Sequence, residues 1–489
     1  MNMWWLSCFG LLLPVVARRD DYEKTGYFWH ITDIHYDPHY SPNGDYRKSC
    51  WRHDNRAAGG SAEGSKAQRR SSSGISGRFG DYGCDTPWEL IESAARFMKS
   101  KQNDNVEFVL WTGDGLSHFA SKHLSESRQL ELLQRLTDLL GKTFPAQFVF
   151  PSLGHDDPAS RRLLGRMWSR WLPTDSMKTF ETGGYYIIER KMLKLQIVVI
   201  NTNLMKRGET DRDASEQWKW LETVLNKFEK SGETVYLVGH VPPGQDERQK
   251  SYFPPFHGAY TDYNNRKYIE LVGNFSSIIA GQFFGHYHSD SFRVIHDKRG
   301  KPISWLMIAP SIAPKRPHVG PNNPAIRMYK FNKDTGQIFD YTQYYLDLST
   351  ANAESRADWS IEYNFTTYYN LNEITAQNLH HLTNKFIYEN SGKSIYASDR
   401  RSILFERYYK ANSVRVGAHP RESCDSTCVQ THYCSITCLD HSEFEYCLKA
   451  KLIPVSGGAI LSVCDSLQIM FTVCLSSASL LIKSAAAIL

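Results

Sequence analysis

Aspartate and histidine side chains recur along this chain in short motifs that could bind metal ions. Asp33 and His35 form a D-x-H pair, and His286 and His288 form a G-H-x-H pair. Residues two apart in an extended segment project to the same side, so Asp33 and His35 could chelate one ion, and His286 and His288 repeat this spacing. Two more candidates follow glycine at the ends of hydrophobic runs: Asp114 in WTGD and His240 in LVGH.

The mixture of imidazole and carboxylate ligands restricts the kind of ion. Zinc, iron and manganese accept such mixtures, whereas magnesium and calcium prefer oxygen ligands alone. Two such ions close together form a clamp for the hydrolysis of phosphate esters. An isolated D-x-H is more often structural than metal-binding, but the ordered set D-x-H, G-D, G-H and G-H-x-H predicts a binuclear hydrolase.

Strands that alternate with helices are expected to position these residues. Amphipathic helices are expected at 130–140 and 218–228, between hydrophobic runs. The tetrapeptide T-P-W-E predicts the start of a third helix, with Thr86 as N-cap, Pro87 at the first position and Glu89 closing a capping box. This alternation predicts an α/β domain with much parallel sheet. The expected strands are 27–33, 106–114, 146–154, 195–203, 234–240 and 276–286.

Polar residues stand at the ends of five of these strands. In α/β sheets, ligands bind beyond the carboxyl ends of the strands, so we expect these ends to converge on one site. The third of them carries an unusual motif, GHDD at 154–157. The five residues concerned are Asp33, Asp114, His155, His240 and His286.

The cysteines favour disulfides. Cys50 and Cys84 flank a loop rich in Gly, Ser and Arg, which we expect them to close. Five more cysteines cluster near the C-terminus, where C-x3-C spacing makes a zinc ribbon the competing interpretation. We expect Cys438 to be the odd member of this cluster, and disulfides at Cys424, Cys428, Cys434 and Cys447.

Both ends of the chain indicate export from the cytosol. Residues 1–17 have an apolar run of secretory length before two arginines, which is typical of a signal peptide. Sequons at Asn274 and Asn364 fit lumenal or extracellular exposure. The apolar tail 450–489 is a candidate glycolipid-anchor (GPI) signal, with a retained membrane span and an altered end as alternatives. We therefore expect a secreted or surface-anchored protein, or one in the lysosomal lumen.

Longer stretches around the candidate ligands resemble a known family. Their order is similar to that in the calcineurin-like metallophosphoesterases, whose third block reads G-N-H-D. More narrowly, FWHITDIHYDPHY, GDYGCDTPWELI, WTGDGLSHF and IAGQFFGHYHSDSF resemble the acid sphingomyelinase-like phosphodiesterases. The likeness spans about residues 26–450 and is closer to the 3B type than to the 3A type, through GHVPPG, GQFFGH and the apolar tail.

The resemblance implies a four-layer αββα sandwich at 26–348 and a small helical, disulfide-bonded subdomain at 349–449. It also implies a phosphodiesterase in which a hydroxide on two zinc ions attacks phosphorus and the histidine of G-N-H-D protonates the leaving group. In the family pattern, Asp33, His35 and His288 hold one ion, and Asp114 bridges to the second. His240, His286 and the G-N-H-D asparagine hold the second ion. His118 contacts the phosphate.

GHDD departs from this pattern in a way that leaves two alignments open. Without a gap, His155 replaces the ligand asparagine and Asp156 replaces the acid histidine. With one residue lost, His155 is the acid, Asp156 is the family aspartate and the asparagine is missing. We favour the second alignment, because the stretch before Trp168 is shorter than in the family. The first alignment loses the proton donor, and general acid help is worth ~10²–10⁴-fold. The second keeps the donor but removes a ligand from one ion, so either change is expected to reduce activity.

The first hypothesis is a zinc-dependent phosphodiesterase that hydrolyses nucleotides or related phosphodiesters. The alternatives are a catalytically impaired, membrane-anchored protein that modulates lipids or receptors by binding, and a sphingomyelin phosphodiesterase. Only Cys8 precedes the catalytic domain, so we expect no cysteine-rich lipid-presenting module, which favours soluble substrates. A net charge of +5 is too slight to indicate nucleic-acid polymers. We expect a monomer.

Overall fold

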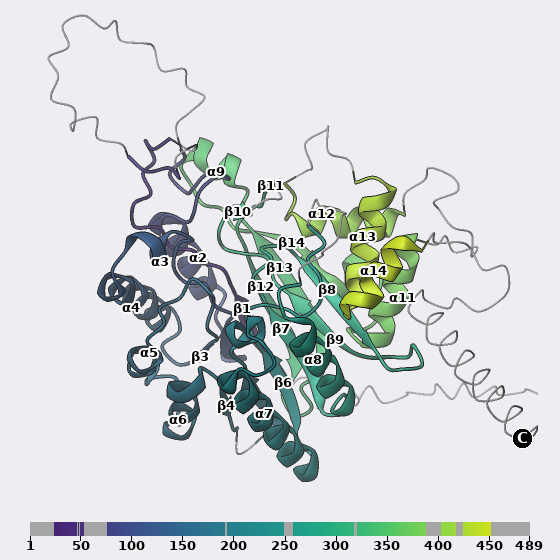
Figure 1. The fold of residues 1–489 in the computed structure, drawn as a ribbon. Helices are drawn as coiled ribbons and strands as arrows, with labels where there is room; N and C mark the ends of the chain where they lie inside the picture. The colour runs from purple at the N-terminus through teal and green to yellow at the C-terminus, as the bar shows by residue number, and fades with distance from the viewer. Residues whose placement is uncertain are drawn as a thin grey trace, which may run out of the picture.

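Two six-stranded sheets pack face to face in the computed structural model of this chain (Figure 1). The structure describes residues 24–45, 47, 49–52, 76–190, 193–248, 258–316, 320–387, 402–416 and 424–450. The predicted signal peptide and all but the first residue of the predicted tail lie outside these ranges. Within them, no helix combines the length and the apolar character that crossing a membrane requires.

The first sheet has the order β14-β13-β12-β1-β2-β3. β1, β2 and β3 run parallel, whereas β12, β13 and β14 add antiparallel strands on the other side of β1. The parallel strands therefore end at the same edge. The bounds are β1 Thr25–Ile31, β2 Val106–Trp111, β3 Phe148–Pro151, β12 Ala325–Asn332, β13 Ile338–Tyr345 and β14 Ser360–Asn364.

The second sheet has the order β4-β5-β6-β7-β9-β8, with parallel pairing from β5 to β9 and antiparallel strands at both edges. A separate two-stranded ribbon, β10 Lys315–Arg316 with β11 Gly320–Pro321, follows it. The bounds are β4 Tyr186–Ile188, β5 Leu195–Val199, β6 Thr234–Val238, β7 Ile279–Phe284, β8 Ser291–His296 and β9 Pro302–Ile308.

Strand periodicity divides the buried side chains between two cores. In β6, Tyr236 and Val238 belong to the core between the sheets, whereas Val235 and Leu237 face the core under the outer helices. This is the alternation expected of a strand buried on both faces. Phe28 of β1 is fully buried and lies at the centre of the inter-sheet core. Its ring centroid is 4.8–5.7 Å from those of Phe108, Tyr236, Phe283, Tyr329 and Phe331.

Helices cover the outer faces of both sheets (Figure 1). On the first sheet lie α2 Trp88–Ser100 and α4 Glu126–Thr143, which also contact each other, with α3 Ala120–His123, α5 Arg161–Trp168 and α6 Thr174–Gly183 nearby in the chain. On the second sheet lie α7 Arg212–Ser231, after the 3-10 helix η4 Thr202–Lys206, and α8 Asp262–Asn274. The molecule is thus a four-layer α/β sandwich, as the sequence predicted.

The C-terminal region is helical and packs against β8 and β9. Its disulfides join Cys424 to Cys428 and Cys434 to Cys447, and Cys50–Cys84 closes the predicted loop. Cys438 is also disulfide-bonded, so the expectation that it is the odd member is wrong. Because the other four cysteines of the cluster pair with one another, Cys438 does not pair within the cluster. The helices are α9 Leu348–Glu354, α10 Phe365–Tyr369, α11 Ala376–Ile387, α12 Ile403–Asn412, α13 Ser426–Thr437 and α14 His441–Lys449.

All six expected strands and all three expected helices are present, with strands shorter than their apolar runs. The predicted capping of α2 is wrong. Pro87 is the N-cap, without a side-chain cap hydrogen bond. Thr86 is engaged elsewhere, because its N–H donates to His35 O and its carbonyl accepts from Asp37 N–H. The first sheet also continues past the predicted boundary at 348 through β14; that boundary stays a prediction.

Replacing Phe28 by alanine should lower the free energy of unfolding by about 3–5 kcal/mol, because it opens a cavity among five aromatic rings. Urea titration followed by fluorescence would measure the loss. Phe148→Ala is the matched control on β3, since that side chain is 53% exposed and should cost less than about 1 kcal/mol. Equal losses in the two variants would contradict this account of the core.

Candidate metal centre

The carboxyl ends of strands from both sheets meet at one place. Asp33 follows β1, and His286 follows β7 of the opposite sheet. The main-chain N–H of His286 donates to Asp33 Oδ2 at 2.8 Å, so the two sheets are bonded directly at this point. Gly285 allows the approach, because a Cβ there would lie 1.9 Å from Thr32 Oγ1. The predicted convergence of strand ends is therefore present.

Asp33, His35 and His288 supply the first group of ligand atoms. Asp33 Oδ1 lies 3.4 Å from His288 Nε2 and 3.7 Å from His35 Nε2, and the two Nε2 atoms are 3.0 Å apart. The Nδ1 atoms of His35 and His288 lie 3.0 Å from Leu116 O and 2.7 Å from Lys315 O, respectively. Because a carbonyl oxygen only accepts, each neutral ring carries its proton on Nδ1 and turns the Nε2 lone pair inward.

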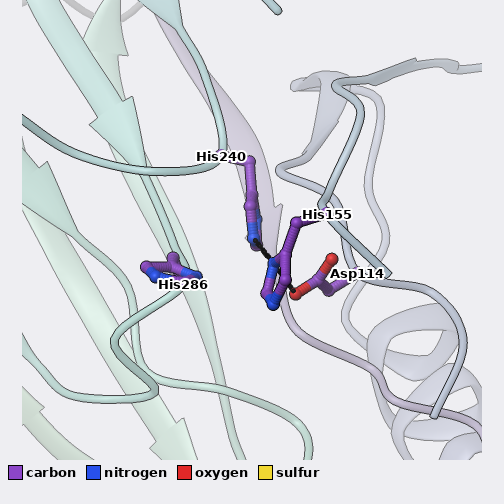
Figure 2. Close-up of side chains that lie close together, drawn as sticks. All are labelled: Asp114, His155, His240 and His286. Carbon is purple, nitrogen blue, oxygen red and sulfur yellow. Dashed lines mark hydrogen bonds and ion pairs between the residues drawn. The ribbon is translucent and has the colours of Figure 1, made fainter. Parts of the chain in front are cut away.

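Asp114, His155, His240 and His286 supply the second group, in which one ligand atom from each lies within 4.8 Å of the others (Figure 2). His155 Nδ1 is 2.9 Å from Asp114 Oδ2 and 3.2 Å from His240 Nε2. The same Asp114 oxygen is 3.1 Å from His240 Nε2 and 3.7 Å from His35 Nε2. Asp114 therefore lies between the two groups, as a bridging ligand must.

Several ligand atoms of the two groups are hydrogen-bond acceptors that face one another. Within the described part of the chain, Asp33 Oδ1, Asp114 Oδ2 and His286 Nδ1 are buried without a hydrogen-bond partner. His240 also turns its lone pair inward, since its Nδ1 donates to Thr112 O at 2.7 Å. Buried acceptors without donors are costly, and a cation removes the cost. These ligand atoms therefore fit two metal ions, and main-chain carbonyls orient the imidazoles.

Left-handed backbone is concentrated in the ligand residues. Non-glycine residues rarely adopt it, and it costs about 1–2 kcal/mol per residue. The extended geometry that we expected for D-I-H and H-Y-H is therefore wrong. Asp33 and His35 still meet in one group, whereas His286 and His288 belong to different groups. A left-handed turn folds the side chains back toward one point, which straight strands would not do. The residues and their φ angles are Asp33 49°, His35 47°, Asp114 50°, His286 70° and His288 52°.

The electrostatics of the centre favour bound cations. Burial by itself would raise the pKa values of Asp33 and Asp114, but neighbouring imidazoles hold both well below the usual range. Burial lowers the pKa of His288 to about 4 and that of His286 well below its usual value. Burial would also lower the pKa of His35, yet the carboxylates of Asp33, Asp114 and Asp85 raise it to about 10. Charged carboxylates thus concentrate negative potential where an ion would sit.

The GHDD loop wraps around Asp114. The Asp156 N–H donates to Asp114 Oδ1 at 2.9 Å, and a Cβ on Gly154 would lie 2.0 Å from the same oxygen. The Asp157 carboxylate accepts from the N–H groups of Gly154, Gly115 and Asp114 at 2.8, 2.8 and 3.1 Å. Burial and then the Asp114 charge raise the pKa of Asp157 to about 6. Sequence reasoning assigned no role to Asp157, which holds two ligand-bearing loops together.

The placement of His155 agrees with the alignment without a gap. Its Nδ1 lies among the second group of ligand atoms, where that alignment places a substitute for the asparagine. Its other ring nitrogen, Nε2, is 3.6 Å from Asp156 Oδ2. A carboxylate beside the outer nitrogen of a histidine ligand is a common way to orient the ring. Asp157 then occupies the position of the family aspartate.

His118 lies beside the first group. Its ring stacks on that of His35 with centroids 3.9 Å apart, and one ring nitrogen lies within 4.8 Å of ligand atoms of His35 and His288. Asp85 Oδ1 and Oδ2 accept from His118 Nδ1 at 2.8 Å and from its main-chain N–H at 3.0 Å. Sequence reasoning missed Asp85, although it directly follows Cys84 of the loop disulfide.

The C-terminal region supports the loop that carries His286 and His288. Asn412, the last residue of α12, donates from Nδ2 to Asp290 O at 3.1 Å, and Asp290 N–H donates back to Asn412 O at 3.3 Å. The next residue, Ser291, bonds through its hydroxyl to Tyr408 of α12 at 2.8 Å. The helical region thus buries and fixes the end of the metal-binding loop.

Comparisons with known proteins agree with this geometry. The family model described as calcineurin-like phosphoesterase matches residues 26–290, and the acid sphingomyelin phosphodiesterase C-terminal region matches residues 301–454. Human acid sphingomyelinase-like phosphodiesterase 3b is 33% identical over 469 residues, covering 90% of this chain and 95% of that protein. The chain belongs to the acid sphingomyelinase-like phosphodiesterases.

The family member named cyclic GMP-AMP phosphodiesterase SMPDL3A from Bos taurus is 34% identical over 390 residues, covering 76% of this chain and 81% of that protein. Its identity is similar to that of the 3b relative, so the two types are almost equally distant from this chain. Like these phosphodiesterases, the chain is a phosphoric diester hydrolase with the fold and the His/Asp metal-binding groups of a binuclear metallophosphoesterase.

If His155 is a ligand, His155→Ala should lower the metal content from about two zinc ions per chain to about one, because the second group loses an imidazole. His155→Asn should keep both ions, since an amide oxygen can replace the ring. Mass spectrometry of the metal after dialysis at fixed free zinc would measure this. Asp156→Asn is the matched control and should keep both ions. Full occupancy in His155→Ala would instead support a role for His155 as proton donor.

Proposed function

We propose that this chain is a zinc-dependent phosphodiesterase that hydrolyses nucleotides or related soluble phosphodiesters. The main support is the set of buried acceptors, Asp33 Oδ1 and Asp114 Oδ2 among the five imidazoles of the two groups, which suits zinc better than magnesium or calcium. The names of the SMPDL3A relatives support a nucleotide substrate, since they are cyclic GMP-AMP phosphodiesterases.

Each ion has three ligands of its own in this proposal, and the two ions share Asp114. Zinc, when bound, supplies Lewis acidity to a phosphate ester and lowers the pKa of water. Asp157 and Asp85 do not touch the ions but hold the loops and the imidazole next to them. Asp33, His35 and His288 hold one ion, Asp114 bridges, and His155, His240 and His286 hold the second.

His118 positions the phosphate. Its Nδ1 proton is directed to Asp85, so in the neutral ring Nε2 can accept, and in the protonated ring it can donate to a phosphate oxygen. Burial by itself would raise the pKa of Asp85, but the hydrogen bond and charge of His118 lower it well below its usual range. Asp85 thus remains a carboxylate that fixes the His118 ring on the face of His35.

The GHDD motif keeps a metal ligand but lacks the proton donor in this proposal. With His155 as a ligand, the position of the family's acid histidine holds Asp156, whose N–H donates to Asp114. A carboxylate is a poor proton donor at neutral pH, so leaving groups that need a proton should depart slowly. We therefore propose an active enzyme that is weakened chiefly toward esters of basic alcohols.

The enzyme acts outside the cytosol in this proposal: secreted, at the cell surface through a glycolipid anchor added near 450–489, or in the lysosomal lumen. The disulfides Cys50–Cys84, Cys424–Cys428 and Cys434–Cys447 fit an oxidising compartment. Asn274 and Asn364 are both exposed, as glycosylation requires.

The purified full chain with zinc should hydrolyse bis(p-nitrophenyl) phosphate and a cyclic dinucleotide, and His240→Ala should reduce both rates to background. Release of p-nitrophenol and chromatography of the nucleotides would measure them. His296→Ala, which alters a histidine paired with His380 outside the centre, should leave both rates unchanged. Zinc bound without turnover would support the binding-protein alternative, and phosphocholine released from sphingomyelin micelles would support the lipid substrate.

Restoring the family order G-N-H-D with His155→Asn and Asp156→His should raise the rate on dialkyl phosphodiesters by about 10²-fold, because it restores a general acid. The rate on bis(p-nitrophenyl) phosphate should change little, since p-nitrophenolate leaves without a proton. The ratio of the two rates is the measurement. An equal gain or loss on both substrates would contradict the proposed defect in proton donation.

A further inference from the structure

We propose that Trp51 and Phe119 form a subsite beside the metal centre that stacks on the base of a nucleotide. This inference rests on the proposed function and names the group that the enzyme recognises next to the phosphate. We call Trp51, Phe119, His39 and His123 the aromatic patch. Trp51 and Phe119 are partly exposed, and His39 and His123 are exposed.

The four rings gather around Trp51. The Trp51 ring centroid is 5.2 Å from that of His39, 5.7 Å from that of His123 and 5.9 Å from that of Phe119. Phe119 and His123 approach Trp51 with interplanar angles of 74° and 84°, and Phe119 is 6.0 Å from His123. Large aromatic side chains left partly exposed together mark a binding surface more often than a core.

The patch is continuous with the metal centre. Phe119 directly follows His118, whose ring lies on that of His35. Lys315 connects the two from the other side, because its carbonyl accepts from His288 Nδ1 while its Nζ lies 5.0 Å from the Phe119 ring centroid. A phosphate at the centre would thus have a neighbouring cation and, one residue further on, aromatic rings.

The position of Trp51 is fixed before any ligand arrives. Its indole N–H donates to Asp37 Oδ2 at 2.7 Å, and it pairs with Tyr40 through an isolated bridge. The preceding residue, Cys50, is fully buried in the disulfide to Cys84, which is followed by Asp85. Preorganised groups lose little conformational entropy on binding, so a rigid indole suits recognition.

A purine or pyrimidine base fits the chemistry of this surface. Every base has a flat π-face, and stacking on an aromatic side chain contributes ~1–3 kcal/mol per base. An acyl chain would favour a purely apolar groove, whereas this patch contains two exposed imidazoles and lies beside the Lys315 ammonium, whose side chain is 22% exposed. The ammonium lies 3.8 Å from Asp85 Oδ1, which holds it beside the patch, and its positive charge favours the anionic sugar-phosphate that a base carries with it.

Binding of adenosine 5′-monophosphate and ribose 5-phosphate to the zinc-loaded full chain tests this subsite without requiring turnover. The two probes share the sugar and the phosphate and differ in the base. Calorimetry should show that wild type binds the nucleotide about tenfold more tightly than the sugar phosphate. Trp51→Ala should abolish most of that difference while leaving the affinity for ribose 5-phosphate unchanged, and Phe119→Ala should reduce it in the same direction.

Trp220→Ala is the matched control, because Trp220 is also partly exposed but packs on Tyr185, with ring centroids 4.5 Å apart, away from the centre. The Trp220→Ala variant should keep the tenfold difference between the two affinities. Trp51→Phe should keep most of it. Equal binding of the two probes by wild type, or an equal loss of both in Trp51→Ala, would overturn the subsite. Failure of hydrolysis in the assays above would refute the proposed function separately, since this measurement needs no catalysis.

Discussion

The buried carboxylate of Asp114, at the meeting point of two sheets, is the constraint on which the rest of the site depends. Its Oδ2 lies 2.9–3.7 Å from nitrogen atoms of His155, His240 and His35, and its Oδ1 accepts from Asp156 N–H. A buried charge is stable only when it is compensated. His35 and His240 direct their Nδ1 protons to main-chain carbonyls and turn Nε2 toward this carboxylate, an arrangement that fits bound cations.

Bringing the ligands together requires backbone that ordinary residues avoid. Five ligand residues have left-handed φ angles, and Gly285 and Gly154 permit contacts that a Cβ would prevent. Such strain persists only where the surroundings hold it in place. Here the inter-sheet core around Phe28 does so from within, and the pairing of Asn412 with Asp290 does so from the C-terminal region. The two regions matched by separate family models therefore act as one unit.

GHDD shows how a motif can change while its architecture persists. An imidazole at 155 reaches the same group of ligand atoms as the other histidines, and Asp157 still binds the loops of Asp114 and Gly154. In the alignment without a gap, the side chain that differs is the one at 156, where the resemblance implies an acid histidine. Metal binding depends on where the loop lies, whereas proton donation depends on the one side chain beside the leaving group. The first can therefore survive a change that weakens the second.

The sequence by itself determined the α/β class, the six strands and the convergence of Asp33, Asp114, His155, His240 and His286, because strand periodicity and strand ends are local properties. Only the tertiary structure decided which atoms meet. His155 contacts Asp114 and His240, which are 41 and 85 positions away, and Asp157 and Asp85 bond to loops brought near by sheet packing. The sequence analysis also did not predict the left-handed turns at the ligands, since it expected extended backbone there. Spacing along the chain predicted the ligands; contact across the sheets decided their roles.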